Sequence, residues 1–208
     1  MSGDEKSSLV VAANRLPVRW SEEDDEWETS PGGLVSALTP ILQEAGGTWV
    51  GWSGTADFAP EPFVQDGIRQ RPVSLSSDEV EDYYLGFCNT TIWPLYHHAI
   101  RTPEYHRHWW RPYDEVNRRF ADAIADSLRW GGTVWVHDYH LQLVPGYLRE
   151  RRSDASIGFF LHIPFPPSEL FAHLPWRRNL LRRLLAADVI GFQTEANVRN
   201  FANWILVS

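Results

Sequence analysis

The sequence predicts an α/β protein with a doubly wound, mostly parallel sheet, and three observations support this fold class. Short apolar segments, typical of buried parallel strands, alternate along the chain with segments of helical periodicity. One such strand, Thr133 to Val136, follows a Gly-Gly pair. The polar residues His137 to His140 come directly after it, at the carboxyl end where open α/β sheets bind ligands.

The individual elements are predicted in chain order from apolar runs, helical periodicity and turn residues. Residues 1–8 are polar and are expected to be disordered, and residues 20–30, with five consecutive acids, are expected to form a surface loop. Strands are expected at 9–13, 48–52, 68–75, 133–136, 156–161 and 189–192. Helices are expected at 34–44, from 76 onward, after Trp93-Pro94, and at 104–130, 141–151, 168–171 and 177–187, with a last one capped by Thr194.

Composition and charge exclude several classes of protein. The 208 residues are 43% hydrophobic, which is enough for one α/β core. No apolar run approaches 18 residues, so no membrane span is predicted, and a net charge of −8 argues against nucleic-acid binding. The single cysteine excludes an intramolecular disulfide and a cysteine metal cage. We therefore expect a cytoplasmic protein.

Three polar residues that follow predicted strands, and one glycine pair that opens a predicted helix, are candidates for ligand binding. Arg15 follows the first strand and is placed for a phosphate or carboxylate, although a surface arginine is the alternative. Gly32-Gly33 opens a helix whose N–H groups could face a ligand. Asp138 is an acceptor for sugar hydroxyls, and His162 is either a hydrogen-bond donor to a substrate or a structural histidine. Together they suit a phosphorylated, hydroxyl-rich ligand.

Other kinds of site are disfavoured by the motifs that the sequence lacks. His137 and His140 could suggest zinc, but the further histidines, at 97, 98, 106 and 108, do not have the spacing of a zinc helix, so we predict no metal. The glycine pair is neither a Walker loop nor a dinucleotide-binding turn, and no nucleophile elbow is present. No cofactor is predicted.

A set of motifs in fixed order resembles the trehalose-6-phosphate synthase family of retaining GT-B glycosyltransferases. The motifs are Asn14-Arg-Leu-Pro17, Gly32-Gly-Leu34, Trp49-Val-Gly-Trp-Ser-Gly54, Asp82-Tyr-Tyr84, Trp93-Pro94, Trp135-Val-His-Asp-Tyr-His140, Gly158-Phe-Phe-Leu-His-Ile-Pro-Phe-Pro166 and Gly191-Phe-Gln-Thr194. They span residues 9 to about 200. The resemblance implies that residues 9–208 form the Rossmann-like, N-terminal, acceptor-side domain of a two-domain GT-B fold.

The resemblance also implies a reaction and a role for each matching residue. The reaction would transfer glucose from UDP-glucose to glucose 6-phosphate with retention, giving α,α-trehalose 6-phosphate. The roles that it implies are acceptor binding by Arg15, Tyr84, Trp93 and Asp138, donor binding by Gly32, Gly33 and His162, catalysis by Asp138 and His162, and anomer selectivity by Trp93 and Ile163. No protein nucleophile is implied, because the leaving phosphate would take the proton of the acceptor hydroxyl.

The family's C-terminal nucleotide-sugar domain has no match in these 208 residues, so we expect the chain alone to be inactive. Two alternatives remain open: a non-catalytic phosphosugar-binding or regulatory module, and a related transferase with another nucleotide sugar or a cyclitol acceptor. The presence of Asp138 and His162 favours an enzyme. Self-association into a homo-oligomer is also left open.

Overall fold

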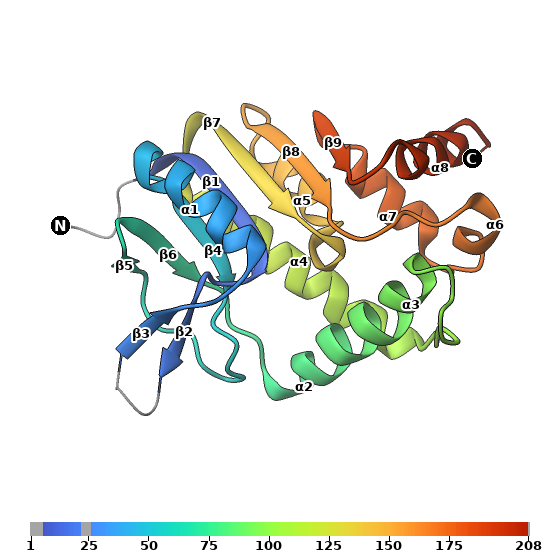
Figure 1. Cartoon of the computed structure of the whole chain (residues 1–208), viewed down its shortest axis with the longest axis horizontal. Coiled ribbons are helices and arrows are strands. Elements are labelled where there is room, and N and C mark those ends of the chain that lie inside the picture. The colour runs from blue at the N-terminus through green and yellow to red at the C-terminus, as the bar shows by residue number, and fades with distance from the viewer. Residues whose placement is uncertain (1–5, 22–25, 208) are drawn as a thin grey trace.

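The computed structural model describes residues 6–21 and 26–207, which build a seven-stranded sheet with helices on both faces (Figure 1). The strand order is β5-β6-β4-β1-β7-β8-β9, and every neighbouring pair is parallel except β5 and β6. The strands are β1 (Ser7–Arg15), β4 (Thr48–Trp52), β5 (Phe63–Gln65), β6 (Ile68–Pro72), β7 (Leu128–His137), β8 (Ser156–Leu161) and β9 (Val189–Phe192). A separate antiparallel hairpin joins β2 (Val18–Ser21) to β3 (Glu26–Thr29).

The helices divide between the two faces of the sheet. The helix α1 (Gly33–Ala45) lies across one face, and α4 (Arg107–Ser127), α5 (Val144–Arg151) and α7 (Arg177–Leu184) lie on the other (Figure 1). The remaining helical segments are α2 (Ser77–Glu79), η1 (Val80–Ile92), α3 (Trp93–Tyr96), η2 (Tyr139–Leu141), α6 (Ser168–Phe171) and α8 (Glu195–Val207). The predicted fold class, a doubly wound and mostly parallel α/β sheet, is confirmed.

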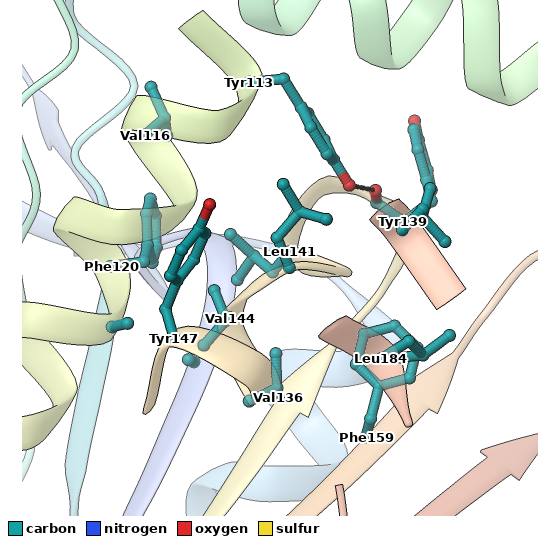
Figure 2. Packing of buried hydrophobic residues seen from close by; sticks show 14 of the residues in the cluster. Tyr113, Val116, Phe120, Val136, Tyr139, Leu141, Val144, Tyr147, Phe159 and Leu184 are labelled. Atoms are coloured by element: carbon teal, nitrogen blue, oxygen red, sulfur yellow. Dashed lines mark hydrogen bonds between the residues drawn. The ribbon is translucent and has the colours of Figure 1, made fainter. Parts of the chain in front are cut away.

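Two hydrophobic cores lie on opposite faces of the sheet because successive side chains of β1 alternate between them. Val10 and Ala12 belong to the larger core, which contains α4 and α5, whereas Val11 and Ala13 pack beneath α1. Aromatic rings fill much of the larger core, as Figure 2 shows for Phe120 and its neighbours. The smaller core does not extend across the sheet, because Trp135 of β7 is 36% exposed and Val189 of β9 is 67% exposed.

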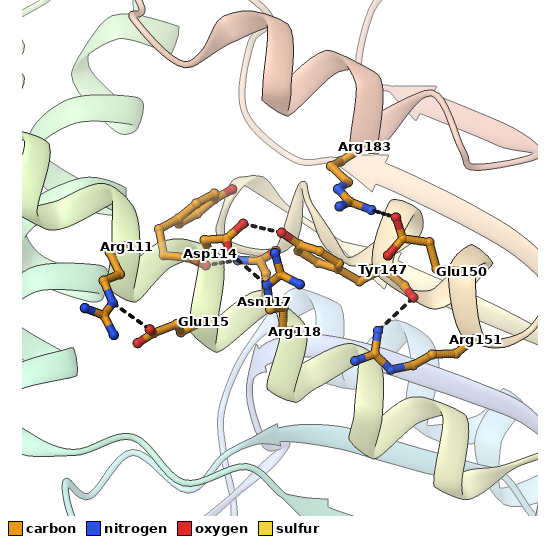
Figure 3. Close-up of polar contacts among 10 residues, drawn as sticks. Arg111, Asp114, Glu115, Asn117, Arg118, Tyr147, Glu150, Arg151 and Arg183 are labelled. Atoms are coloured by element: carbon orange, nitrogen blue, oxygen red, sulfur yellow. Dashed lines mark hydrogen bonds and ion pairs between the residues drawn. The ribbon is translucent and has the colours of Figure 1, made fainter.

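Buried polar contacts fix the segment that follows β7. Asn117 of α4 is fully buried, and its Nδ2 donates to the carbonyl oxygens of Tyr113 (2.9 Å) and His140 (3.0 Å). Its Oδ1 accepts from the backbone N–H of Leu143 at 3.0 Å. Figure 3 shows Asn117 beside Tyr147 of α5, whose ring lies between the guanidinium groups of two arginines of α4 and α7. These contacts hold η2 and α5 against α4, and thereby fix the backbone at His140.

Several predicted elements have the bounds that the sequence suggested, and others do not. Strands 48–52, 156–161 and 189–192 and helix 168–171 are confirmed. The predicted helix from residue 76 begins with a capping box between Ser76 and Glu79, but it continues as a π-helix, η1. The predicted helix 141–151 begins instead as the short 3-10 segment η2 followed by α5, with Pro145 in its first turn.

Two predictions near the N-terminus are wrong. The predicted disorder of residues 1–8 fails at Ser7 and Ser8, which belong to β1, since the buried Ser7 hydroxyl lies 2.7 Å from Oγ1 of Thr48; residues 1–5 lie outside the described chain. The predicted loop 20–30 contains a hairpin instead. Its strands pair Trp20 with Trp27, whose ring centroids are 5.4 Å apart, and such aromatic pairs stabilise antiparallel strands. Residues 22–25 lie outside the described chain.

Candidate functional site

The carboxyl ends of β1, β7 and β8 meet at one edge of the sheet, and a pocket of about 450 Å³ lies there. Parallel pairing of β1 with β7 and of β7 with β8 places Arg15, Asp138 and His162 at neighbouring strand ends. All three line the pocket, together with His137 and His140. The sequence-based expectation that polar residues gather at this edge is confirmed for Arg15, Asp138 and His162.

Arg15 presents a positive charge that no carboxylate neutralises within residues 6–21 and 26–207. Its Cζ lies 4.3 Å from the centroid of the Trp52 ring and 5.6 Å from that of Tyr84, so both rings hold the guanidinium by cation–π contact. Gly51 is required beneath the backbone of Arg15, because a Cβ at that position would lie 2.6 Å from the Arg15 carbonyl carbon. This guanidinium is therefore fixed in position and available to an anion.

Tyr84, in the π-helix η1, does not line the pocket but contacts two residues that do, Arg15 and His140. The preceding residue, Tyr83, is fully buried and donates its hydroxyl hydrogen to Oδ1 of Asn14 at 2.7 Å, which anchors the helix to the end of β1. Tyr84 then stacks on His140, with ring centroids 5.8 Å apart and an interplanar angle of 19°. The π-helical backbone thus sends two consecutive tyrosines to different partners around Arg15. Segments of π-helix are rare and occur often at functional sites.

Asp138 joins the ends of β7 and β8 and has a strained backbone. Its φ of 73° and ψ of 170° lie in a region that residues other than glycine seldom adopt. Its Oδ1 accepts hydrogen bonds from the backbone N–H groups of Tyr139 (3.0 Å) and His162 (3.2 Å). Among the described residues Oδ2 has no donor, so it remains available to a ligand hydroxyl. Burial raises the pKa of this carboxyl.

Three histidines surround Asp138, and two of them remain uncharged at neutral pH. Nδ1 of His137 lies 2.9 Å from Nε2 of His162. Burial, helped by the neighbouring His162, lowers the pKa of His137 to about 3. Burial, helped by the charge of Arg15, likewise lowers the pKa of His140 to about 3. Among the residues that the structure describes, the site therefore combines one free cation, one carboxylate and the neutral imidazole rings of His137 and His140.

The other predicted site residues lie around this pocket rather than in its wall. Gly32 and Gly33 are exposed at the start of α1, and a Cβ at either would meet nothing within 4 Å. Their neighbours Pro31 and Leu34 do line the pocket. Trp93, at the start of α3, packs on the ring of His97 with centroids 4.1 Å apart, and Ile163 packs on the larger core. The pocket thus does not bring these four together with Arg15.

No metal site and no membrane span is found in the part of the chain that the structure describes. Among those residues no three His, Cys, Asp or Glu side chains gather closely enough to hold a metal ion. His137, which the sequence left as a conceivable zinc ligand, is instead hydrogen-bonded to His162. None of the described helices is long and apolar enough to cross a membrane.

Two aromatic contacts of the site were not predicted from the sequence. Trp52 was noted only as part of a motif, although its ring holds the Arg15 guanidinium. His140 was placed among the polar residues at the ligand-binding strand end and weighed as a zinc ligand, but its stacking on Tyr84 was not predicted. The position of His140, four residues after Val136, places it at the ligand-binding edge but does not indicate its aromatic partner.

Comparison with known proteins gives consistent matches along nearly the whole chain. The model of glycosyltransferase family 20 matches residues 7–205. The trehalose-6-phosphate synthase of Mycolicibacterium smegmatis is 55% identical over 198 residues, which are 94% of this chain and 39% of that protein. That of Mycobacterium ulcerans is 54% identical, with 94% of this chain and 40% of the relative covered. The chain therefore spans about 40% of the length of these curated relatives.

Solved structures match with the same partial coverage. A UDP-forming α,α-trehalose-phosphate synthase from Burkholderia xenovorans matches with a TM-score of 0.85 and 35% identity, covering 97% of this chain and 42% of that one. A structure of such a synthase from the same organism in complex with glucose-6-phosphate has a TM-score of 0.80 and 33% identity, covering 95% and 42% of the two chains. An E. coli structure bound with UDP-2-fluoro glucose has a TM-score of 0.83 and 34% identity, covering 96% and 42%.

The match of the family model over residues 7–205 establishes that this chain belongs to glycosyltransferase family 20.

Proposed function

We propose that this chain is the acceptor-side domain of an enzyme that transfers glucose from UDP-glucose to glucose 6-phosphate, forming α,α-trehalose 6-phosphate with retention. The observation that carries the proposal is the unneutralised guanidinium of Arg15, held by two aromatic rings at the pocket that also contains Asp138 and His162. A phosphate on the acceptor sugar is the natural partner for such a group, because guanidinium and phosphate form charge-assisted, bidentate hydrogen bonds.

The proposed roles follow the geometry of the pocket. Arg15 and Tyr84 hold the acceptor phosphosugar, and Oδ2 of Asp138 accepts a hydrogen bond from an acceptor hydroxyl near the reaction centre. Trp93 and Ile163 select the α anomer of the acceptor from outside the pocket wall. We place the enzyme in the cytoplasm, where its phosphorylated sugar substrates are made.

The donor lies against α1 and β8 in this proposal. The space above Gly32 and Gly33 that a side chain would occupy is empty, so a diphosphate could approach the backbone N–H groups at the helix start. His162, at the end of β8, donates a hydrogen bond to the donor glucose.

The chemistry needs positioning and charge stabilisation rather than a protein nucleophile. Asp138 is the single acid among the described residues that line the pocket, whereas retaining hydrolases with a covalent intermediate use two carboxylates. The departing UDP phosphate would take the proton of the acceptor hydroxyl as the new bond forms on the same face of the glucose. Cationic groups for that phosphate would be supplied by a segment that corresponds to the part of the relatives outside the matched region.

The test uses the protein as its gene encodes it, or a chimaera in which residues 7–205 replace the matching segment of the Mycolicibacterium smegmatis relative. Arg15→Ala should raise the KM for glucose 6-phosphate about 10- to 100-fold, the effect of a charged hydrogen bond. The control is Arg111→Ala, since Arg111 is exposed and paired with Glu115 on α4. An unchanged dependence on glucose 6-phosphate would contradict the role of Arg15, and absence of transfer in the unmodified protein would contradict the proposed function.

A further inference from the structure

His137 has a defined contact that the proposed chemistry leaves unused. It is the last residue of β7, and its side chain is 1% exposed. Its Nδ1 lies 2.9 Å from Nε2 of His162, and the two rings are 5.2 Å apart at an interplanar angle of 27°. The ring of Trp135 flanks His137 at 4.9 Å, and Phe160 flanks His162 at 4.8 Å. The pair is therefore confined and cannot easily reorient.

A hydrogen bond between two imidazole nitrogens needs one donor and one acceptor. His137 is neutral near pH 7, because burial lowers its pKa to about 3. It therefore carries one ring hydrogen, on either Nδ1 or Nε2. If the hydrogen is on Nδ1, His137 donates to His162. If it is on Nε2, His137 accepts, and His162 must donate from its own Nε2.

The surroundings of the other nitrogen of His137 distinguish these two arrangements. Its Nε2 is buried and has no hydrogen-bond partner in the described chain. A hydrogen at that position would be a buried donor without an acceptor, and buried N–H groups without partners are rarer than buried acceptors without them. The arrangement with the hydrogen on Nδ1 leaves only an unpaired lone pair there.

We propose that His137 is a positioning residue that donates its Nδ1 hydrogen to Nε2 of His162 and thereby fixes the tautomer of His162. With Nε2 occupied as an acceptor, a neutral His162 carries its hydrogen on Nδ1. That nitrogen has no partner among the described residues and is not buried. His162 therefore presents a hydrogen-bond donor to the pocket, as a sugar oxygen requires. This last step rests on the proposed function, whereas the tautomer itself does not.

The backbone of His162 is fixed as well. Its N–H donates to Oδ1 of Asp138 at 3.2 Å, so the carboxylate sets the main chain while His137 sets the ring. His137, the last residue of β7, and Asp138, which follows it, thus determine the tautomer and the position of His162, which directly follows β8. Partners that orient a functional histidine through its second nitrogen commonly do both.

The direct test is the imidazole nitrogen NMR spectrum of the protein as its gene encodes it, with ¹⁵N-labelled histidine and assignment by single substitutions. Both His137 and His162 should show the hydrogen on Nδ1. In His137→Leu, which removes the donor, His162 should shift toward the Nε2–H form. A hydrogen on Nε2 of His162 in the unmodified protein, or an unchanged tautomer in His137→Leu, would overturn the proposal.

A kinetic test uses a substitution that keeps the donor. The side-chain N–H of His137→Asn can occupy the place of Nδ1–H, so kcat should stay within a few-fold, whereas His137→Leu should lower kcat about 10- to 100-fold with little change in the KM for glucose 6-phosphate. His173→Asn, at an exposed turn after α6, controls for the substitution itself. Equal loss in the Asn and Leu variants would overturn the proposal. Absence of transfer in the unmodified protein would instead refute the proposed function, and the NMR result would still decide the tautomer.

Discussion

Three substitutions at Asp138 separate what its backbone strain, its hydrogen bonds and its charge contribute to stability. Asp138→Ala keeps the unfavourable φ of 73° and removes the acceptor of two backbone hydrogen bonds, from Tyr139 and His162. At about 1 kcal/mol net for each bond, the loss should be about 2 kcal/mol. Asp138→Gly loses the same bonds but adopts this conformation without strain. After the entropy of a glycine in the unfolded chain is included, it should be more stable than the Ala variant by about 1 kcal/mol.

Asp138→Asn removes the charge of the side chain while keeping its size and its hydrogen-bond acceptor. Its amide oxygen can still accept both backbone hydrogen bonds, but it carries no charge. Burial raises the pKa of the Asp138 carboxyl, so its contribution to stability is complete below the unfolded-state pKa and declines as the pH rises through the folded-state pKa. The Asn variant lacks this decline. Relative to the unmodified protein it should therefore gain stability as the pH rises, while it loses the transfer activity that needs the carboxylate.

Equilibrium unfolding in urea, with midpoints and slopes measured near neutral pH and at about pH 4, tests both expectations. The three variants differ at one position only, so contributions from all other positions cancel when their free energies of unfolding are compared. If the Gly variant were no more stable than the Ala variant, the backbone of Asp138 would not be strained. If the Asn variant lost stability relative to the unmodified protein between the lower and the higher pH, the carboxylate would be stabilised by its surroundings and the direction of its pKa shift would be wrong.

Three further predictions concern packing, an ion pair and the length of the chain. Gly86→Ala should destabilise the protein by about 1–3 kcal/mol, because the added Cβ would lie 2.7 Å from the Trp109 ring; an unchanged urea midpoint would contradict this packing. Arg119→Met should cost about 1 kcal/mol by removing the two contacts with Glu79, at 2.9 and 2.7 Å, and the hydrogen bond to the Ser74 carbonyl, and less in high salt, which screens the Glu79 pair; equal losses at both salt concentrations would argue against a contribution from that ion pair. A polypeptide limited to residues 1–208 should form no detectable trehalose 6-phosphate, since each missing charge-stabilising donor costs about 10²–10³ in rate, and measurable turnover would refute this.

The fold could be predicted largely because its signals are local. The strand Ser156–Leu161 is a short apolar run bounded by polar residues, and the structure has it at the predicted bounds. The β2–β3 hairpin was missed because its stability comes from Trp20 and Trp27 across the strands, while the acidic run between them is typical of a loop. The π-helix η1 has no distinctive sequence signal, since its apolar residues fit an ordinary helix as well.

The site could be predicted only as far as topology determines it. Arg15, Asp138 and His162 follow strands, and parallel pairing brings strand ends to one edge whatever the side chains are. The contact of Trp52 with Arg15 and that of His137 with His162 depend instead on side-chain packing between segments far apart in sequence. A single sequence does not contain that information, so the site appeared as separate residues rather than as contacts.

Three unfavourable features of this molecule lie at the same strand ends. Asp138 has a positive φ, and His137 and His140 supply two of the four buried side-chain atoms that have no partner in the described chain. Each of these features is expected to lower the stability of the fold. If this edge only completed the fold, apolar or paired residues would serve better there. The strained Asp138 beside an unneutralised Arg15 is instead typical of a ligand site. A polar group without a partner in the protein can bind a ligand without first breaking a contact within the protein.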